Sequence, residues 1–256
     1  MIGVSGGEAG LLRLPMPPGG DPTGSLQEIV PQRFASAGLT NAAGRPLRLT
    51  VPSDDGLGYE ERIWQKGELA TRPNCRHDAF NALVWLAFPR AKAALNAAHV
   101  QARSPSARGP RRDALTHLDE CGVIVTAEDA SLLDLLRGFR WKALFWKRRS
   151  EVERKLRCFI FGHATCEHLL APFRGLTGKA VLYAVPPGWH AGSWEGQFAD
   201  LDARLAADLA DGFPARPRDL QPLPLLGIPG VVAGNAKPDY YDDEFQFRPG
   251  RRVSDR

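Results

Sequence analysis

The segment after Gly162 contains a histidine and a carboxylate, His163 and Glu167, at positions i and i+4. Residues with this spacing lie on one face of a helix. On one face, they can share a divalent metal ion or act as a hydrogen-bonded acid–base pair. We therefore predict that both residues are catalytic and that both bind a metal ion. The alternative is a buried hydrogen bond between the two side chains that orders the start of the helix, with His168 on the surface.

The same segment does not match the metalloprotease motifs that it resembles at first sight. It reads His-Ala-Thr-Cys-Glu-His, whereas zincins need His-Glu-x-x-His and the inverse motif needs His-x-x-Glu-His. His163 and His168 are separated by about 140° around a regular helix, so they cannot bind one ion together.

A second group of carboxylates, Asp113, Asp119 and Glu120, follows Arg112. We expect two short strands around Glu120, and carboxylates at a strand end beside a tight turn often hold Mg²⁺ or Mn²⁺. If these groups approach His163, the set suits metal-assisted hydrolysis. We predict Asp119 as a metal ligand and as a catalytic residue together with Glu120. Arg112 and Asp113 are expected to line the pocket. The alternative is a plain turn, for which Asp and Gly are typical, with Arg112 paired to a neighbouring carboxylate.

Polar residues also occupy the first turn of a helix expected from residue 78. His77 and Asn81 share the helix face that continues into apolar residues, so they form either the floor of a pocket or a hydrogen-bonded core network. Asp78 is stabilised by the helix N-terminus and is assigned to the same pocket. Further along, Lys92 and Asn96 at i and i+4 are expected to form a solvent-facing pair.

Residues 140–157 carry eight basic and two acidic side chains, with Trp141 and Trp146 among them. A basic stripe with aromatic residues can follow a phosphate backbone and stack on bases, which makes a nucleic-acid-binding module one alternative function. The other interpretation is a solvated face whose tryptophans point inward. In that case an acidic run near the C-terminus is expected to cover the stripe, and it consists of Asp239, Asp242, Asp243 and Glu244.

The composition limits the possible classes of protein. Lys and Arg (33) exceed Asp and Glu (29) by only four charges, too small an excess to require a nucleic-acid partner. The 4 cysteines show no Cys-x-x-Cys spacing, so a zinc ribbon is not indicated. No run of about 18 apolar residues and no basic leader with an apolar core is present, so we expect a cytoplasmic protein without membrane spans.

The 26 Gly and 21 Pro residues indicate short elements joined by many turns. Helical spacing and turn residues predict the following elements: helices at 78–88 and 90–100 with a corner at Phe88–Pro89, a helix starting near Thr126–Asp129 and ending at Gly138, an amphipathic helix from Trp141, strands at 156–161 and 180–185, and a helix at 195–211.

These elements predict an α+β fold, with several short helices packed on a small sheet and a long irregular C-terminal segment wrapped across it. We expect a flexible N-terminal tail (1–25), one globular domain (26–250) and a basic C-terminal tail (251–256). Residues 26–58 are expected to form an extended arm over the core, and the apolar stretch after residue 222 is expected to pack down.

Four segments in order resemble a known family: 77–96, 112–125, 161–180 and 222–249. Across about residues 45–250, the chain is similar to the bacterial family of domains of unknown function 3025. The resemblance implies a stand-alone bacterial protein and carries no activity, substrate, cofactor or catalytic residue with it.

The prediction of function therefore rests on the residues themselves. It favours a metal-assisted hydrolase with a His/carboxylate site, a divalent metal as cofactor and a small-molecule substrate. The alternatives are the nucleic-acid-binding module and a non-enzymatic structural or partner-binding protein.

Overall fold

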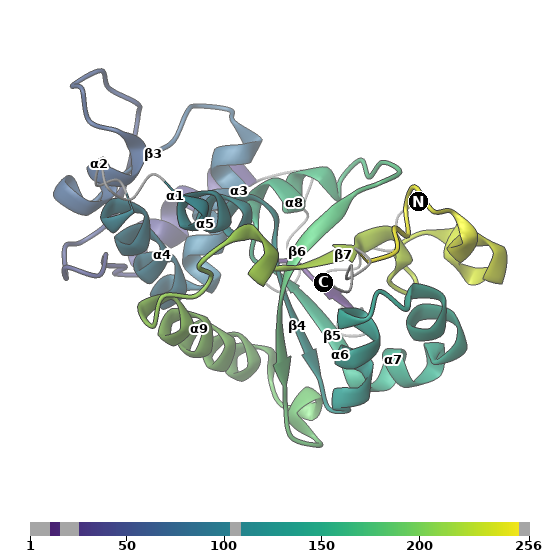
Figure 1. Ribbon diagram of the computed structural model, residues 1–256. Helices are drawn as coiled ribbons and strands as arrows, with labels where there is room; N and C mark the ends of the chain where they lie inside the picture. The colour runs from purple at the N-terminus through teal and green to yellow at the C-terminus, as the bar shows by residue number, and fades with distance from the viewer. Residues whose placement is uncertain (1–10, 16–25, 103–108, 251–256) are drawn as a thin grey trace.

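Figure 1 shows the computed structural model, which describes residues 11–15, 26–102 and 109–250. A mixed sheet with the strand order β1-β5-β4-β6-β7 lies at its centre. Its strands are β1 (Leu12–Arg13), β4 (Gly122–Ala127), β5 (Leu156–Ile160), β6 (Thr177–Ala184) and β7 (Gln221–Pro224). β4 runs antiparallel to β5 and parallel to β6, so the fold is α+β, as predicted.

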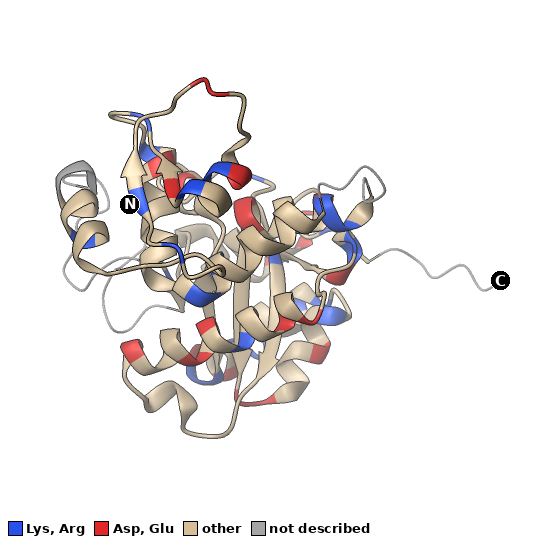
Figure 2. Ribbon diagram, turned by 90° about the vertical axis from the view of Figure 1, so that its left-hand side faces the viewer, with Lys and Arg blue, Asp and Glu red and all other residues tan. Residues whose placement is uncertain are grey.

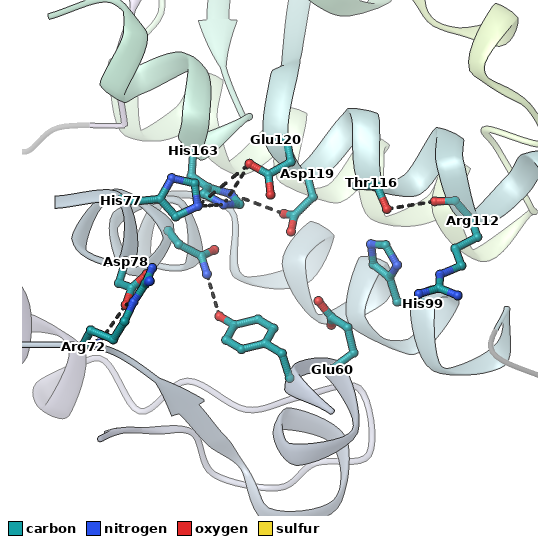
Figure 3. Close-up of a pocket in the computed structure, with 12 residues that line it drawn as sticks. Glu60, Arg72, His77, Asp78, His99, Arg112, Thr116, Asp119, Glu120 and His163 are labelled. Atoms are coloured by element: carbon teal, nitrogen blue, oxygen red, sulfur yellow. Dashed lines mark hydrogen bonds and ion pairs between the residues drawn. The ribbon is translucent and has the colours of Figure 1, made fainter. Parts of the chain in front are cut away.

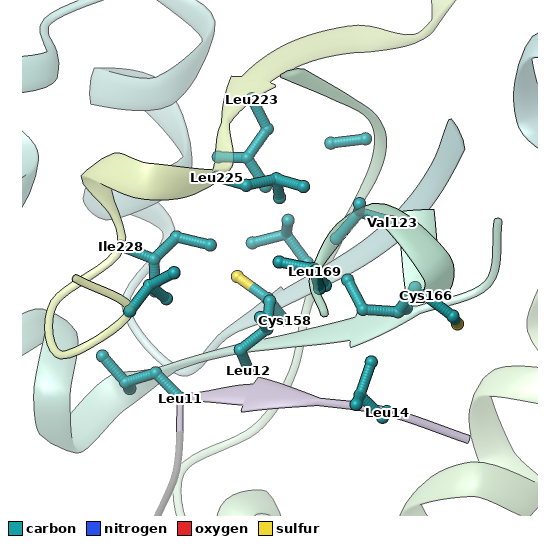
Figure 4. Packing of buried hydrophobic residues seen from close by; sticks show 14 of the residues in the cluster. Leu11, Leu12, Leu14, Val123, Cys158, Cys166, Leu169, Leu223, Leu225 and Ile228 are labelled. Carbon is teal, nitrogen blue, oxygen red and sulfur yellow. The ribbon is translucent and has the colours of Figure 1, made fainter. Parts of the chain in front are cut away.

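Helices cover both faces of the sheet, and therefore every residue of β4 is buried. Val123 and Val125 face a cluster built with α6 (Ala130–Arg137), α7 (Arg149–Lys155) and the C-terminal segment. Ile124, between them in the sequence, faces α4 (Pro89–Gln101), α5 (Pro110–Cys121) and α9 (Trp194–Ala210). The alternation follows from the two-residue repeat of a strand. Figure 4 shows the first cluster, to which Leu12 of β1, Val123 of β4 and Leu223 of β7 all belong.

The N-terminal part forms a small lobe beside α3 (Arg76–Ala87) and α4 (Figure 1). It contains α1 (Leu26–Ser36), α2 (Tyr59–Lys66) and a parallel pair of strands, β2 (Arg48–Thr50) and β3 (Glu68–Ala70). The predicted extended arm at 26–58 is therefore wrong, because residues 26–36 are helical and Val30 and Phe34 pack into the core. Most of the predicted tail 1–25, and all of 251–256, lies outside the described residues, but Leu12 is buried in β1 against β5.

Several predicted elements are confirmed. α3 ends at Ala87 and α4 begins at Pro89, with Phe88 between them in a non-helical conformation. The strand from Leu156, the long helix α9 and the packing of the stretch after residue 222 are also present.

Other elements differ from the prediction. The two strands expected around Glu120 are wrong: α5 continues to Cys121, and a single strand begins at Gly122. Leu115 and Leu118 pack against the sheet from α5, and this burial stabilises the helix there. The next helix begins later than predicted, because β4 extends to Ala127 and Asp129 forms the N-cap by accepting a hydrogen bond from the Ser131 N–H. The helix from Trp141 passes into a π-helical turn at Ala143–Lys147.

Within the described residues, the remaining helices are α8 (His163–His168) and five 3₁₀ turns at Trp189–Ala191, Pro217–Asp219, Leu225–Gly227, Ala233–Ala236 and Pro238–Asp242. α8 packs against α3 and α5. Over the part of the chain that the structure describes, no helix combines the length and the apolar character needed to span a membrane.

Candidate functional site

Three side chains from three helices direct one atom each toward a common point (Figure 3). The Nε2 atoms of His77 and His163 lie 3.0 Å apart. The Oε2 atom of Glu120 lies 3.4 Å from the His163 Nε2 atom and 3.9 Å from the His77 Nε2 atom. Ligands of a tetrahedral ion with bonds of about 2.0–2.1 Å are themselves about 3.3 Å apart. The three atoms are therefore spaced as the ligands of one divalent ion would be.

The convergence depends on a close backbone contact between α8 and the end of α5. His163 is the first residue of α8, and Glu120 lies in the last turn of α5. The Phe161 and Gly162 N–H groups both donate to the Gly122 carbonyl oxygen, at 3.0 and 2.8 Å. A Cβ atom at Gly162 would lie 2.5 Å from the Glu120 carbonyl oxygen, so only glycine permits this approach.

Glu167 lies beside His77 and contacts the ring nitrogen that faces away from the cluster. Its Oε2 atom is 3.2 Å from the His77 Nδ1 atom. A proton on Nδ1 that is donated to this carboxylate leaves the Nε2 lone pair available for a metal. The sequence suggested that Glu167 and His163 pair within one helix. Instead, His77 of α3 stands between them, and Glu167 orients a histidine that is 90 residues away in the chain.

His163 is buried, and burial lowers its pKa to about 4, although the nearby Asp119 charge opposes this shift. The ring is therefore neutral at neutral pH, which is the form that binds metals. Its Nδ1 atom lies 3.8 Å from the Asp119 Oδ1 atom. Burial and the Asp119 charge raise the pKa of Glu120, whereas the charge of His77 lowers it.

Asp119 is bound to a buried lysine, Lys92, through its Oδ1 atom. Burial by itself would raise the pKa of Asp119, but the Lys92 ammonium outweighs it and holds the pKa at about 2. Asp119 also belongs to a second group of potential ligands, with Glu60 and His99. The expectation that Lys92 and Asn96 face solvent is wrong: both are buried, because their face of α4 packs against α2.

The three ligand atoms border a cavity of about 350 Å³. The sequence analysis predicted seven of the residues that line it, namely His77, Asp78, Asn81, Arg112, Asp119, Glu120 and His163. It missed the other five, namely Tyr59, Glu60, Arg72, His99 and Thr116.

Two of the residues predicted for the pocket have other roles. The Asp78 carboxylate accepts hydrogen bonds from the Arg72 Nε and Nη2 atoms, at 2.9 and 2.8 Å, so it is occupied by this ion pair at the edge of the cavity. Asp113 is exposed on α5 and does not line the cavity.

The buried polar residues on α4 could have been found from their spacing. Lys92, Asn96 and His99 lie at i, i+4 and i+7, which places them on one helix face. No comparable signal marks Tyr59 or Glu60, because nothing in the sequence shows that α2 packs on α4.

The basic stripe at 140–157 is divided among local contacts. Trp141 is buried, Arg148 binds Asp129 and Glu151, and Lys142 binds Asp242 of the acidic run. Acidic and basic residues are interspersed over the helices (Figure 2). These ion pairs favour the interpretation of the stripe as a solvated face that the acidic run partly covers.

Comparison with known proteins identifies one match. A family profile described as "Protein of unknown function (DUF3025)" matches residues 48–251. No curated protein and no solved structure matches the chain.

Proposed function

This chain belongs to the DUF3025 family, and we propose that it is a metal-dependent hydrolase whose ion is held by His77, His163 and Glu120. The observation that carries the proposal is the 3.0 Å distance between two imidazole Nε2 atoms that also share a carboxylate neighbour. The other nitrogen of the His77 ring contacts the Glu167 carboxylate at 3.2 Å, whereas the Nδ1 atom of His163 makes no hydrogen bond and has the Asp119 carboxylate as an ionic neighbour at 3.8 Å. Histidine ligands of metal ions usually have a partner such as Glu167.

Two imidazoles and one carboxylate are a donor set that suits Zn²⁺. Three protein ligands would leave a coordination position for water or substrate, and all three residues line the cavity. A zinc ion lowers the pKa of a bound water molecule to about 7 and polarises a carbonyl or phosphoryl oxygen. The polar cavity of about 350 Å³ accommodates a small substrate or the reactive end of a larger one.

The first experiment is measurement of metal content and Zn²⁺ affinity of the purified full-length chain. We expect about one equivalent of bound metal in the wild type, and strong loss of binding in His77→Gln and in His163→Gln. His168→Gln is the matched control, because His168 is an exposed histidine on the same helix as His163. Circular dichroism spectra of all variants separate loss of binding from loss of folding. Unchanged Zn²⁺ affinity in both site variants would refute the metal centre.

The second experiment tests the reaction with p-nitrophenyl acetate and bis(p-nitrophenyl) phosphate. We expect the Zn²⁺-loaded wild type to hydrolyse at least one of them, a chelator to abolish the activity, and Zn²⁺ to restore it. A protein that binds one Zn²⁺ through these residues but hydrolyses neither compound would retain the metal centre and contradict the hydrolase.

A further inference from the structure

We propose that Tyr59 is a catalytic residue of this site, whose hydroxyl donates a hydrogen bond to the substrate oxygen that gains negative charge during hydrolysis. Lys92 and Asn81 are the positioning residues that orient this hydroxyl. The inference rests on the proposed hydrolase function and adds a role for three residues outside the metal ligands.

The argument begins at Lys92, because an ammonium group can only donate hydrogen bonds. Its Nζ atom donates to the Asp119 carboxylate and, at 2.9 Å, to the Asn81 Oδ1 atom. The carbonyl end of the Asn81 amide must therefore face Lys92. All three residues are buried, so the arrangement is shielded from water.

The orientation of Asn81 decides the role of the Tyr59 hydroxyl. With its oxygen toward Lys92, the Asn81 amide presents its N–H group to Tyr59, and the Nδ2 atom lies 2.6 Å from the Tyr59 Oη atom. The hydroxyl oxygen is the acceptor in this bond. Its own proton is therefore available to a different acceptor, and the hydroxyl donates no hydrogen bond to another described residue.

Two further observations concern the position of the Tyr59 hydroxyl and its protonation state. Asn81 lies one helical turn after His77 on the same face of α3, so the hydroxyl that it binds borders the same cavity as the metal ligands. Burial of the hydroxyl and the charges of Glu60 and Asp119 hold the pKa of Tyr59 well above its usual value of 10.0, although the Asn81 hydrogen bond lowers it. The group therefore keeps its proton at neutral pH.

A fixed donor of this kind stabilises charge that develops in the transition state more than it stabilises the bound substrate. Attack of water on an ester or amide places negative charge on the former carbonyl oxygen, and His77, His163 and Glu120 would hold the ion that activates this water. The Tyr59 hydroxyl keeps its proton throughout and contributes a hydrogen bond only. Removing one such donor lowers kcat by about 10²–10³-fold in enzymes where this has been measured.

The test compares Tyr59→Phe with the wild type after both are loaded with Zn²⁺. Acetohydroxamate serves as the probe, because its oxygens bind zinc and accept hydrogen bonds. We expect equal Zn²⁺ affinity, acetohydroxamate affinity lower by about 10-fold or more, and a kcat for p-nitrophenyl acetate lower by about 10²-fold with little change in KM. Tyr240→Phe, which removes a hydroxyl far from the cavity, is the control.

Asn81→Asp tests the positioning role without removing the tyrosine. A carboxylate still accepts from Lys92, but it also accepts the Tyr59 proton and so withdraws it from the substrate. We expect a loss of acetohydroxamate affinity similar to that in Tyr59→Phe, and no further loss when the two changes are combined. A purely structural role predicts losses that add.

The two proposals fail in different ways. If the wild type binds no Zn²⁺, the metal centre is wrong and this inference falls with it. If Zn²⁺ binds normally but Tyr59→Phe leaves both acetohydroxamate affinity and kcat unchanged, only the role of Tyr59 is overturned.

Discussion

Replacing Glu167 tests whether a carboxylate behind a histidine controls the affinity of the proposed centre. Glu167→Ala removes the acceptor that lies 3.2 Å from the His77 Nδ1 atom and leaves the three proposed ligands, His77, His163 and Glu120, in the chain. Without this acceptor, His77 loses its fixed orientation and the proton is free to move to the Nε2 atom, where it blocks metal binding.

The expected size of the effect follows from the exposure of the pair. Loss of such a partner usually weakens metal affinity by about 10–100-fold. The His77 and Glu167 side chains are 34% and 40% exposed, so water can partly replace the lost acceptor. We therefore expect the lower end, about 10-fold, which corresponds to about 1.4 kcal/mol. Glu167→Gln should cost less, because its side-chain oxygen still accepts from the ring.

The assay is competitive titration of Zn²⁺ against a chromogenic chelator, with Glu195→Ala as a control on a distant helix. Glu120→Gln should weaken binding far more than Glu167→Ala, because Glu120 is a proposed ligand. Equal losses in the two variants would mean that Glu167 is itself a ligand, as its spacing from His163 first suggested. No loss in Glu167→Ala would refute the reasoning about His77.

Three further predictions concern the framework of the site and stability. Gly162→Ala should lower the free energy of unfolding, measured in urea, by about 3 kcal/mol, because the added Cβ atom would lie 2.3 Å from the Gly122 nitrogen. A loss near zero would mean that the backbone contact between Gly162 and Gly122 adapts easily. Lys92→Met should lower the free energy of unfolding by about 3–5 kcal/mol, because it leaves the Asp119 carboxylate buried and unpaired. Adding Asp119→Leu should recover most of this loss, and no recovery would contradict the ion-pair argument. Burial lowers the pKa of His190 to about 4, below its usual value of 6.5. As pH falls from 6.5 to 4, only the unfolded state protonates the His190 ring, so the free energy of unfolding of the wild type should decrease over this range. In urea denaturation measured at several pH values, His190→Gln should remove up to about 3 kcal/mol of this decrease. Parallel pH profiles of the two proteins would show that His190 is not responsible.

Local sequence signals predicted those elements whose ends are marked by the chain itself. Pro89 ends one helix and begins the next, and β-branched residues before Thr126 mark a buried strand. The prediction failed at Glu120, where a polar segment ending in glycine looks like a turn. The helix forms there because Leu115 and Leu118 are buried against distant elements, and that burial is a tertiary effect.

The candidate site shows the same division between local and long-range information. Residue types and spacing singled out the three residues one by one: His163 and Glu120 as ionisable groups close to a glycine, and His77 as a polar group at the start of an apolar helix face. Their combination was not predictable, since the hydrogen bond between the two histidines joins residues 86 positions apart.

The sequence by itself determined which residues are candidates for a metal site and where most helices and strands lie, because composition and periodicity are local properties. The tertiary structure alone decided which nitrogen meets which oxygen. Glu167, expected to pair with His163, contacts His77 instead, and Lys92, expected to face solvent, is the buried partner of Asp119. The physical reason is that the spacing of residues fixes the face of a helix on which a side chain lies, whereas the packing of α3, α5 and α8 fixes what that face meets.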